Sequence, residues 1–225
     1  MNPSRLETFS DGVFAIAITL LVLTISLPQD YTHLGHELAH RWPSLAAYVV
    51  SFIIIGIMWL NHHTVFSHLE SVDRGFIFLN LLLLMTIAFL PYPTGVLGEA
   101  LAKGHGTTTA AAVYGVTMVL NACAWAALWL YASRDRRLLR PSFPEEQRAM
   151  ATLLFTLGAV VYSAAVGFAF WNAYAFLAIQ GVLALYYALD PISRRVARSG
   201  LAATENELTA PTTNLMGESS AGRPE

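Results

Sequence analysis

The sequence predicts an all-α integral membrane protein that crosses the bilayer about six times, with both termini in the cytoplasm. First, 55% of its 225 residues are hydrophobic and only 12% are charged, whereas soluble domains carry about 25% charged residues. Second, the chain contains several nearly charge-free stretches of about 20 residues, the length that a helix needs to cross the hydrocarbon layer. Third, the cationic residues between these stretches fall almost entirely on one side. These features are typical of lipid-embedded helices.

Five apolar stretches define the expected spans. They are residues 9–27, 42–60, 75–97, 107–133 and 149–189. The last is about twice the length of one crossing, so it is divided near Trp171 and Asn172 into spans five and six. Pro91 and Pro93 in the third stretch are positions at which a helix can break. Because the stretches are apolar on nearly every side, a soluble amphipathic bundle is not favoured.

The distribution of lysine and arginine predicts the orientation, because cytoplasmic loops hold the excess of these residues. With six spans, only Arg41 and Lys103 of the 13 cationic residues fall on the far side. Residues 1–198 are therefore expected to form a six-span transmembrane domain with a cytoplasmic start. Residues 199–225 are rich in Thr, Glu, Pro, Ser and Gly, and we expect a disordered cytoplasmic tail.

Several function classes are disfavoured by composition. The net charge is −2 and the isoelectric point is about 6.4, which gives no indication of nucleic-acid binding. Cys123 is the single cysteine, so no multi-cysteine zinc or iron-sulfur site can form. No phosphate-binding loop or redox ligand set is visible. We expect no enzymatic activity, no cofactor and no structural metal.

Polar and charged residues gather at the cytoplasmic end of the first span, in the segment that contains Arg5, Phe9, Ser10 and Asp11. One reading is a helix start with Ser10 or Asp11 as the N-cap. The other is a polar network, because ionisable groups inside a membrane usually face a partner or water. Arg5 and Asp11 are six residues apart and do not share a helix face. Each would therefore find its partner on another helix or subunit.

Candidate partners lie at the same membrane level on the second and third spans, and they are Trp59, Asn61, His62, His63 and Asn80. A buried cluster of this kind must be nearly fully hydrogen-bonded, so it would fix how the helices meet. An alternative reading makes His62, His63, His68 and Glu70 metal ligands. It is not favoured, since these residues lack the HExxH pattern and no cysteine accompanies them.

A narrow apolar stripe runs along the first span. Ile16, Leu20 and Leu23 follow the spacing i, i+4, i+7, Phe9 and Leu27 extend the stripe, and Thr19 lies beside it. On its own, such a stripe is typical of a surface that faces lipid or a packed neighbour.

The segment Arg5-x-x-x-Phe9-Ser10-Asp11, followed by Ile, Leu and Val residues, resembles the RxxxFSD signature of the transmembrane protein 175 family of potassium channels. Trp59-x-Asn61-His62-His63 and Asn80-Leu81-Leu82-Leu83-Leu84 resemble the second and third spans of that family. The resemblance covers the first half of the chain residue by residue, and the rest by span number and length.

This resemblance implies a homotetramer in a prokaryotic plasma membrane, with the first span of each subunit lining the pore. Rings of bulky apolar side chains would form the constriction, carried over here to Ile16, Leu20 and Leu23, with Thr19 as a hydroxyl layer. The polar network would then be structural, and His62 or His63 would couple cytoplasmic pH to opening. The sequence has no TVGYG-like filter segment, so carbonyl-based selectivity is not expected.

The expected function is therefore passive, leak-type conduction with modest selectivity for potassium. The first rival is a proton-coupled secondary transporter that uses Asp11 and His62, although no matched break or inverted repeat is visible. An intramembrane metalloenzyme built on His62, His63 and Asp11 and a scaffold without transport are further alternatives. Saturating flux would favour the transporter, bound metal the enzyme, and absence of flux the scaffold.

Overall fold

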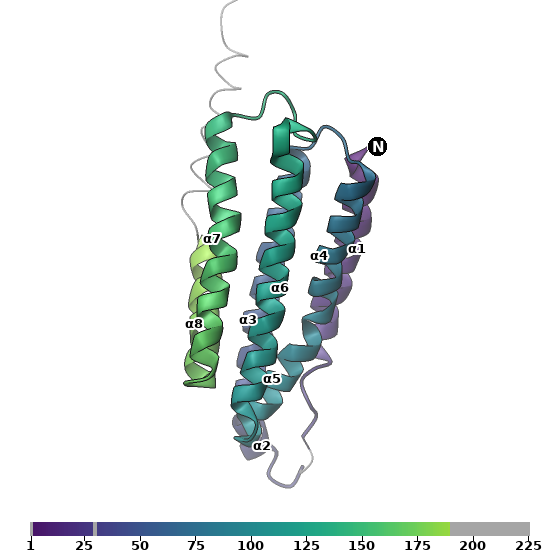
Figure 1. Ribbon diagram of the computed structural model, residues 1–225. Helices are drawn as coiled ribbons and strands as arrows, with labels where there is room; N and C mark the ends of the chain where they lie inside the picture. The colour runs from purple at the N-terminus through teal and green to yellow at the C-terminus, as the bar shows by residue number, and fades with distance from the viewer. Residues whose placement is uncertain (1, 29–30, 190–225) are drawn as a thin grey trace, which may run out of the picture. The chain divides into compact units, whose positions relative to one another are not determined.

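The computed structural model describes residues 2–28 and 31–189, and residues 2–188 of these belong to one compact unit. The predicted tail, residues 199–225, and its boundary at residue 198 lie outside the described residues. The helices are α1 (Pro3–Val22), α2 (Leu34–His40), α3 (Trp42–Ser67), α4 (Arg74–Phe89), α5 (Pro91–Lys103), α6 (Thr107–Ser133), α7 (Glu145–Ala169) and α8 (Ala173–Leu189) (Figure 1). The part that the structure describes contains no named strand, and its one isolated bridge joins Leu69 and Leu139.

The helices of this unit form an all-helical assembly in which α1 packs on α3 and α4, α4 packs on α6, and α6 packs on α7. In Figure 1 these five helices run alongside one another, with α5 continuing from the end of α4. The all-α fold class is thus confirmed.

Helix α1 begins earlier than the apolar pattern indicates. The side chain of Asn2 accepts a hydrogen bond from the Ser4 amide, and Pro3 occupies the first helical position, where its missing N–H is no loss. The alternative that Ser10 or Asp11 caps the helix is therefore wrong. Both residues lie inside α1, and the helix ends at Val22 instead of reaching residue 27.

The third expected span is divided in two. Helix α4 ends at Phe89, and α5 starts at Pro91. Pro91 and Pro93 have no amide hydrogen, so neither can donate the usual helical bond to the carbonyl four residues earlier. The helical hydrogen bonding is therefore interrupted at Leu90, next to the two prolines at which the sequence predicts a possible break. Residues 74–103 nevertheless remain long and apolar enough for one crossing.

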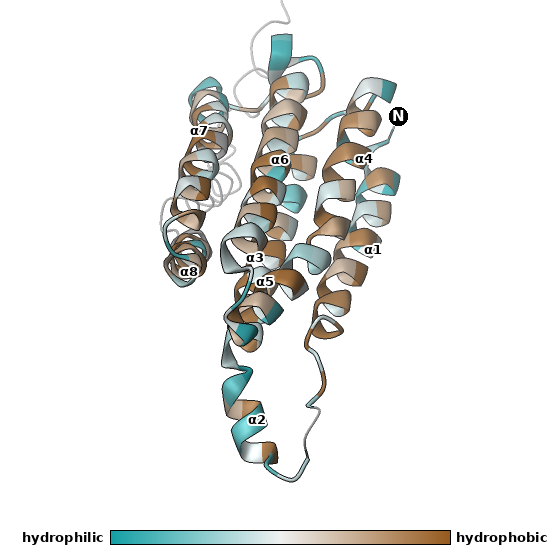
Figure 2. Cartoon of the chain, turned by 60° about the horizontal axis from the view of Figure 1, so that its bottom comes forward, coloured by the Kyte–Doolittle hydropathy of each residue, from teal (hydrophilic) through white to brown (hydrophobic). Residues whose placement is uncertain are grey.

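Four segments in the described residues are long and apolar enough to cross a membrane, namely Trp42–Ser67, Arg74–Lys103, Thr107–Ser133 and Glu145–Ala169. Helix α1 has 20 residues but carries Arg5, Glu7 and Asp11 in its first half, and α8 has 17 residues. Neither is among the four. Figure 2 shows hydrophobic residues along the lengths of the long helices, with hydrophilic residues prominent near helix ends and on α2.

Close contacts between neighbouring helices hold the unit together. A Cβ atom on Gly98 of α5 would lie 2.8 Å from the Cα atom of Ser44 in α3, so the glycine allows these two backbones to approach. Between α6 and α7, the rings of Trp125 and Phe155 stack with centroids 5.7 Å apart. Most of the buried core lies between α1 and α3–α6, and Ala169 of α7 and Phe176 of α8 also belong to it.

Candidate functional site

Helix α1 has two contrasting faces. Ser10, Phe14, Ala17 and Leu21 are buried against the rest of the unit. The apolar stripe of Ile16, Leu20 and Leu23 is exposed, with exposed fractions of 60%, 42% and 76%. At 100° per residue the two sets point roughly 120° apart. One face of α1 is thus fixed by packing, and the other is open within a single chain.

A hydrogen-bonded chain of three buried side chains joins α1, α3 and α4. The Nε2 atom of His62 lies 2.9 Å from Oδ1 of Asn80, and Nδ2 of Asn80 donates to Oγ of Ser10 at 3.0 Å. Ser10 in turn donates to the backbone carbonyl of Leu6 at 2.8 Å. All three side chains are completely buried. We call Ser10, His62 and Asn80 the polar anchor.

The direction of these bonds assigns the His62 tautomer. Because the Asn80 amide donates through Nδ2, its Oδ1 atom accepts, and Nε2 of His62 must therefore carry the hydrogen. The other ring nitrogen, Nδ1, is buried without a hydrogen-bond partner. The imidazole is enclosed by aromatic rings instead, stacking on Phe66 at 4.2 Å and meeting Phe14 edge-on at 5.3 Å between centroids. The anchor is thus held in place on several sides.

Two further contacts tie α1 to α3 at the border of the anchor. Nε1 of Trp59 donates to Oδ1 of Asp11 at 2.9 Å, and Nδ1 of His63 lies 2.9 Å from Oε1 of Glu7. Glu7 and Asp11 are one helical turn apart on α1, as are Trp59 and His63 on α3, so the two pairs face each other across the antiparallel helices. The partner of Asp11 is therefore on another helix.

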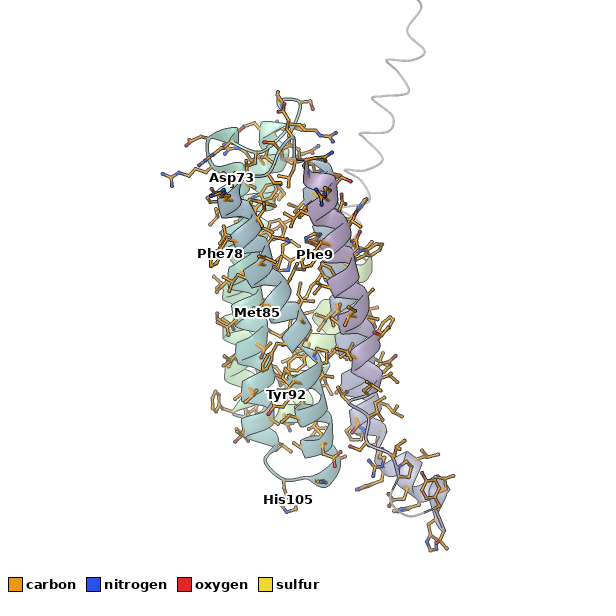
Figure 3. The ribbon with its side chains drawn as sticks, turned by 90° about the vertical axis from the view of Figure 1, so that its right-hand side faces the viewer. Phe9, Asp73, Phe78, Met85, Tyr92 and His105 are labelled. Carbon is orange, nitrogen blue, oxygen red and sulfur yellow. The ribbon has the colours of Figure 1, made fainter. Side chains whose placement is uncertain are left out.

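The sequence-predicted polar set is not gathered in one place. Ser10, His62 and Asn80 form the anchor, and Asp11 and Trp59 form a pair beside it. Arg5 and Asn61 are exposed and make no side-chain hydrogen bond or ion pair with the described residues. Phe9 is also exposed, on the outward side of α1 (Figure 3).

Glu7 was absent from the sequence-predicted set, although it binds His63. The signal that could have found it is spacing: Glu7 and Asp11 are four residues apart, and so are Trp59 and His63. Asp11 and His62, which the transporter reading joins, bind different partners, Trp59 and Asn80. Among the described side chains, no group of three or more His, Cys, Asp or Glu is placed to hold a metal ion.

Thr19 lies on the exposed side of α1 beside the apolar stripe. Its hydroxyl donates to the carbonyl oxygen of Ile16 at 2.9 Å. Because this hydroxyl donates its hydrogen within the helix, its oxygen keeps both lone pairs as acceptor sites on the exposed side of α1. Leu23 follows the last residue of α1 as its C-cap.

Two loops near the start of α1 are bound to each other. The Glu70 amide donates to Leu138 O at 2.9 Å, and the Arg140 amide donates to His68 O at 3.0 Å. Burial, followed by the nearby charge of Arg140, lowers the pKa of His68. Its ring also contacts Phe143, with centroids 4.7 Å apart. The α3–α4 loop is thus held by the loop between α6 and α7.

Asp73 completes this end of the unit, next to the start of α4 (Figure 3). Its carboxylate caps α4 by accepting from the Phe76 amide at 2.9 Å. It also accepts from the Tyr131 hydroxyl and pairs with Arg137 at 3.1 Å. The bond from the Phe76 amide, together with the Tyr131 and Arg137 contacts, lowers the pKa of Asp73.

These features define an all-helical membrane protein in which one face of the first helix is packed against the other helices and the other face is apolar and exposed. Residues 5–91, which include most of α1 and all of α3 and α4, match the family described as endosomal/lysosomal potassium channel TMEM175. A potassium channel of Streptomyces collinus is 48% identical over 195 residues, covering 85% of this chain and 95% of the relative. The chain therefore belongs to the TMEM175 family.

Two further similarities extend over most of the chain. A potassium channel of Chamaesiphon minutus is 38% identical, over 82% of this chain and 93% of that protein. The crystal structure of a lysosomal potassium-selective channel TMEM175 homolog from Chamaesiphon minutus matches with a TM-score of 0.75 and 37% identity, covering 83% of this chain and 96% of that one. The family is one of channels, a class without enzymatic activity.

Proposed function

We propose that this chain is a potassium-conducting channel that assembles as a homotetramer, with α1 of each subunit lining the pore. The names and sequence identity of the relatives support potassium as the ion. The observation that carries the pore assignment is the contrast on α1. Its inward face is fixed by the polar anchor, whereas the apolar stripe is open in the single chain and available to meet three copies of itself.

The stripe supports a mechanism that depends on partial dehydration. Four isoleucines at the level of Ile16 would form a narrow apolar opening that excludes bulk water, so a cation must lose part of its hydration shell to pass. Potassium is larger and more weakly hydrated than sodium, so it loses that water at lower cost. The expected outcome is modest selectivity for potassium. The Thr19 oxygens would offset part of the lost hydration.

The proposed topology has six crossings in a prokaryotic plasma membrane, with both termini in the cytoplasm. To the four apolar segments it adds α1 and the shorter α8. The charged residues of α1 lie in its first half, where partners on α3 compensate Glu7 and Asp11, and this allows the rest of the helix to lie in hydrocarbon. The excess of arginine in the loops at this end supports a cytoplasmic start.

Conduction is proposed to be passive and to need no cofactor. The spans carry no regularly spaced arginines of the kind that sense voltage, so we expect leak-type conduction with weak voltage dependence. The polar anchor is proposed to be structural, because each of its three members binds another helix or its own backbone. Coupling of cytoplasmic pH to opening, through His62 or His63, is also part of the proposal.

The test is ion flux from liposomes that contain the purified protein, with a potassium or a sodium gradient and protein-free liposomes as the control. We expect potassium flux that exceeds sodium flux and does not saturate in the millimolar range. Saturating flux that requires a proton gradient would favour the transporter. Absence of flux from protein that elutes as a folded tetramer would contradict the proposal.

A further inference from the structure

Helix α2 carries two histidines one turn apart, at the end of the unit away from the start of α1 (Figure 1). The rings of His36 and His40 are nearly parallel, with an angle of 8° between their planes and 6.2 Å between their centroids. Both residues are exposed. Neither ring makes a hydrogen bond or ion pair with any described residue. In contrast, His62, His63 and His105 each place a ring nitrogen on a protein partner.

We propose that His36 and His40 form a binding site for a divalent transition-metal ion of the nickel, copper or zinc type. Neutral imidazole is a preferred ligand of these ions. Two histidines at i and i+4 project from the same helix face, which is the spacing that lets both nitrogens reach one ion. Hard cations such as magnesium prefer oxygen ligands and would not be held by this pair.

The surroundings of the pair define what completes the coordination. The Oε2 atom of Glu37, on the same helix, lies 3.8 Å from Nη2 of Arg41 in an i, i+4 ion pair. The Glu37 carboxylate is therefore paired with the Arg41 guanidinium. No third His, Cys, Asp or Glu joins the two rings among the described residues. Water would therefore occupy the remaining positions, and the ion would exchange freely with solution.

Metal binding would also order α2. The helix has seven residues, so it is too short to be stable alone. An ion that joins positions i and i+4 would clip one turn together. The next residue, Arg41, is the C-cap of α2, and its Nη1 atom donates to the carbonyl of Ser26 at 3.0 Å. Ordering of α2 would thus extend to the segment that follows α1.

The test is calorimetric titration of full-length protein, prepared without a histidine tag, with nickel, zinc or magnesium chloride. We expect one nickel or zinc ion per chain and no magnesium binding. His36→Ala or His40→Ala should weaken the affinity at least about tenfold, the smaller of the losses seen for changes that only support a metal ligand. The matched control is His105→Ala, an exposed histidine of the α5–α6 loop without a second histidine one turn away. It should bind as the unmodified chain does.

Hydrogen exchange provides an independent measurement. Zinc should slow amide exchange in residues 34–41 of the unmodified chain and leave the same amides of the His40→Ala variant unchanged. Equal nickel affinity in the unmodified and His36→Ala proteins would overturn the site, as would a loss of affinity in His105→Ala of the same size. Neither readout requires ion conduction, so the inference stands or falls separately from the proposed function.

Discussion

The two faces of α1 differ in their contacts: one is buried and hydrogen-bonded to other helices, and the other is apolar and exposed. The inward face buries Ser10, which accepts a hydrogen bond from Asn80 of α4, and Asn80 in turn is bound to His62 of α3. The outward face leaves Ile16, Leu20 and Leu23 exposed in the part of the chain that the structure describes. The comparison teaches that the position of the helix and its chemistry toward the ion path are controlled by separate residues. Changes on one face should therefore leave the property of the other nearly intact.

The largest expected effect on stability comes from the centre of the anchor. Asn80→Leu keeps a similar volume but leaves the Nε2–H group of His62 without an acceptor, at a cost of about 1 to 3 kcal/mol. The free energy of unfolding in detergent micelles measures this loss. Phe78→Leu, an exposed position on the same helix (Figure 3), is the control and should cost less than about 0.5 kcal/mol. Equal stability of the two variants would contradict the structural role of the anchor.

A smaller effect is expected beside the anchor. Trp59→Phe removes the indole N–H that donates to Asp11 but keeps an aromatic ring against α1. The half-buried Asp11 can turn to water, so the loss should be about 1 kcal/mol. The same unfolding measurement applies to Trp59→Phe, to Asp11→Ala, which removes the acceptor, and to the two changes combined. If the two changes add fully, the side chains do not interact and the contact has no energetic weight.

On the outward face, Thr19→Val replaces a hydroxyl by a methyl group of similar volume. If the Thr19 oxygen replaces lost hydration, the potassium-to-sodium flux ratio should fall by about two- to tenfold, the range that one hydrogen bond's free energy corresponds to. Stability should change little, because the residue is exposed. An unchanged flux ratio would remove Thr19 from the mechanism and leave the apolar stripe as the sole source of selectivity.

The smallest effect is a pH dependence that arises outside the spans. The pKa of His68 is lowered in the folded protein by burial and by Arg140. As pH falls through the unfolded value of about 6.5, the unfolded state takes up the proton first, so stability decreases. His68→Gln should therefore flatten the fall in melting temperature between pH 7.5 and 5.5. Asp73, whose pKa is also lowered, loses its contribution only below about pH 4, so it does not interfere between pH 7.5 and 5.5. Identical slopes in both proteins would contradict this assignment.

The helical class and the breaking effect of Pro91 and Pro93 could be predicted from the sequence, because both depend on local chemistry. The start of α1 could not be read from hydropathy. Its first turns are polar, and Asn2 and Pro3 set the boundary instead. Two of the expected spans are not among the four segments that qualify by length and composition: α1 carries three charged residues, and α8 is too short.

The polar residues show a similar division. Spacing identified side chains that share a face of a helix, such as Ile16 and Leu20, but it did not show which face meets which neighbouring helix. The structure joins Ser10 with Asn80 and His62, whereas it leaves Arg5 and Asn61 at the surface without a described partner. The partner choice depends on helix packing, which a single sequence does not encode in any local pattern. The metal-binding proposal for α2 likewise required the ring geometry.

The most direct test of the pore assignment compares two exposed apolar positions. Ile16 on α1 and Met85 on α4 are 60% and 62% exposed in the single chain, so Ile16→Asn and Met85→Asn introduce the same amide at matched positions. The measurement is potassium and sodium flux from liposomes. Ile16→Asn should lose most of the preference for potassium, because a polar ring at the constriction stays hydrated. Met85→Asn should retain that preference. Equal selectivity in both variants and the unmodified protein, or a loss confined to Met85→Asn, would contradict a pore lined by α1.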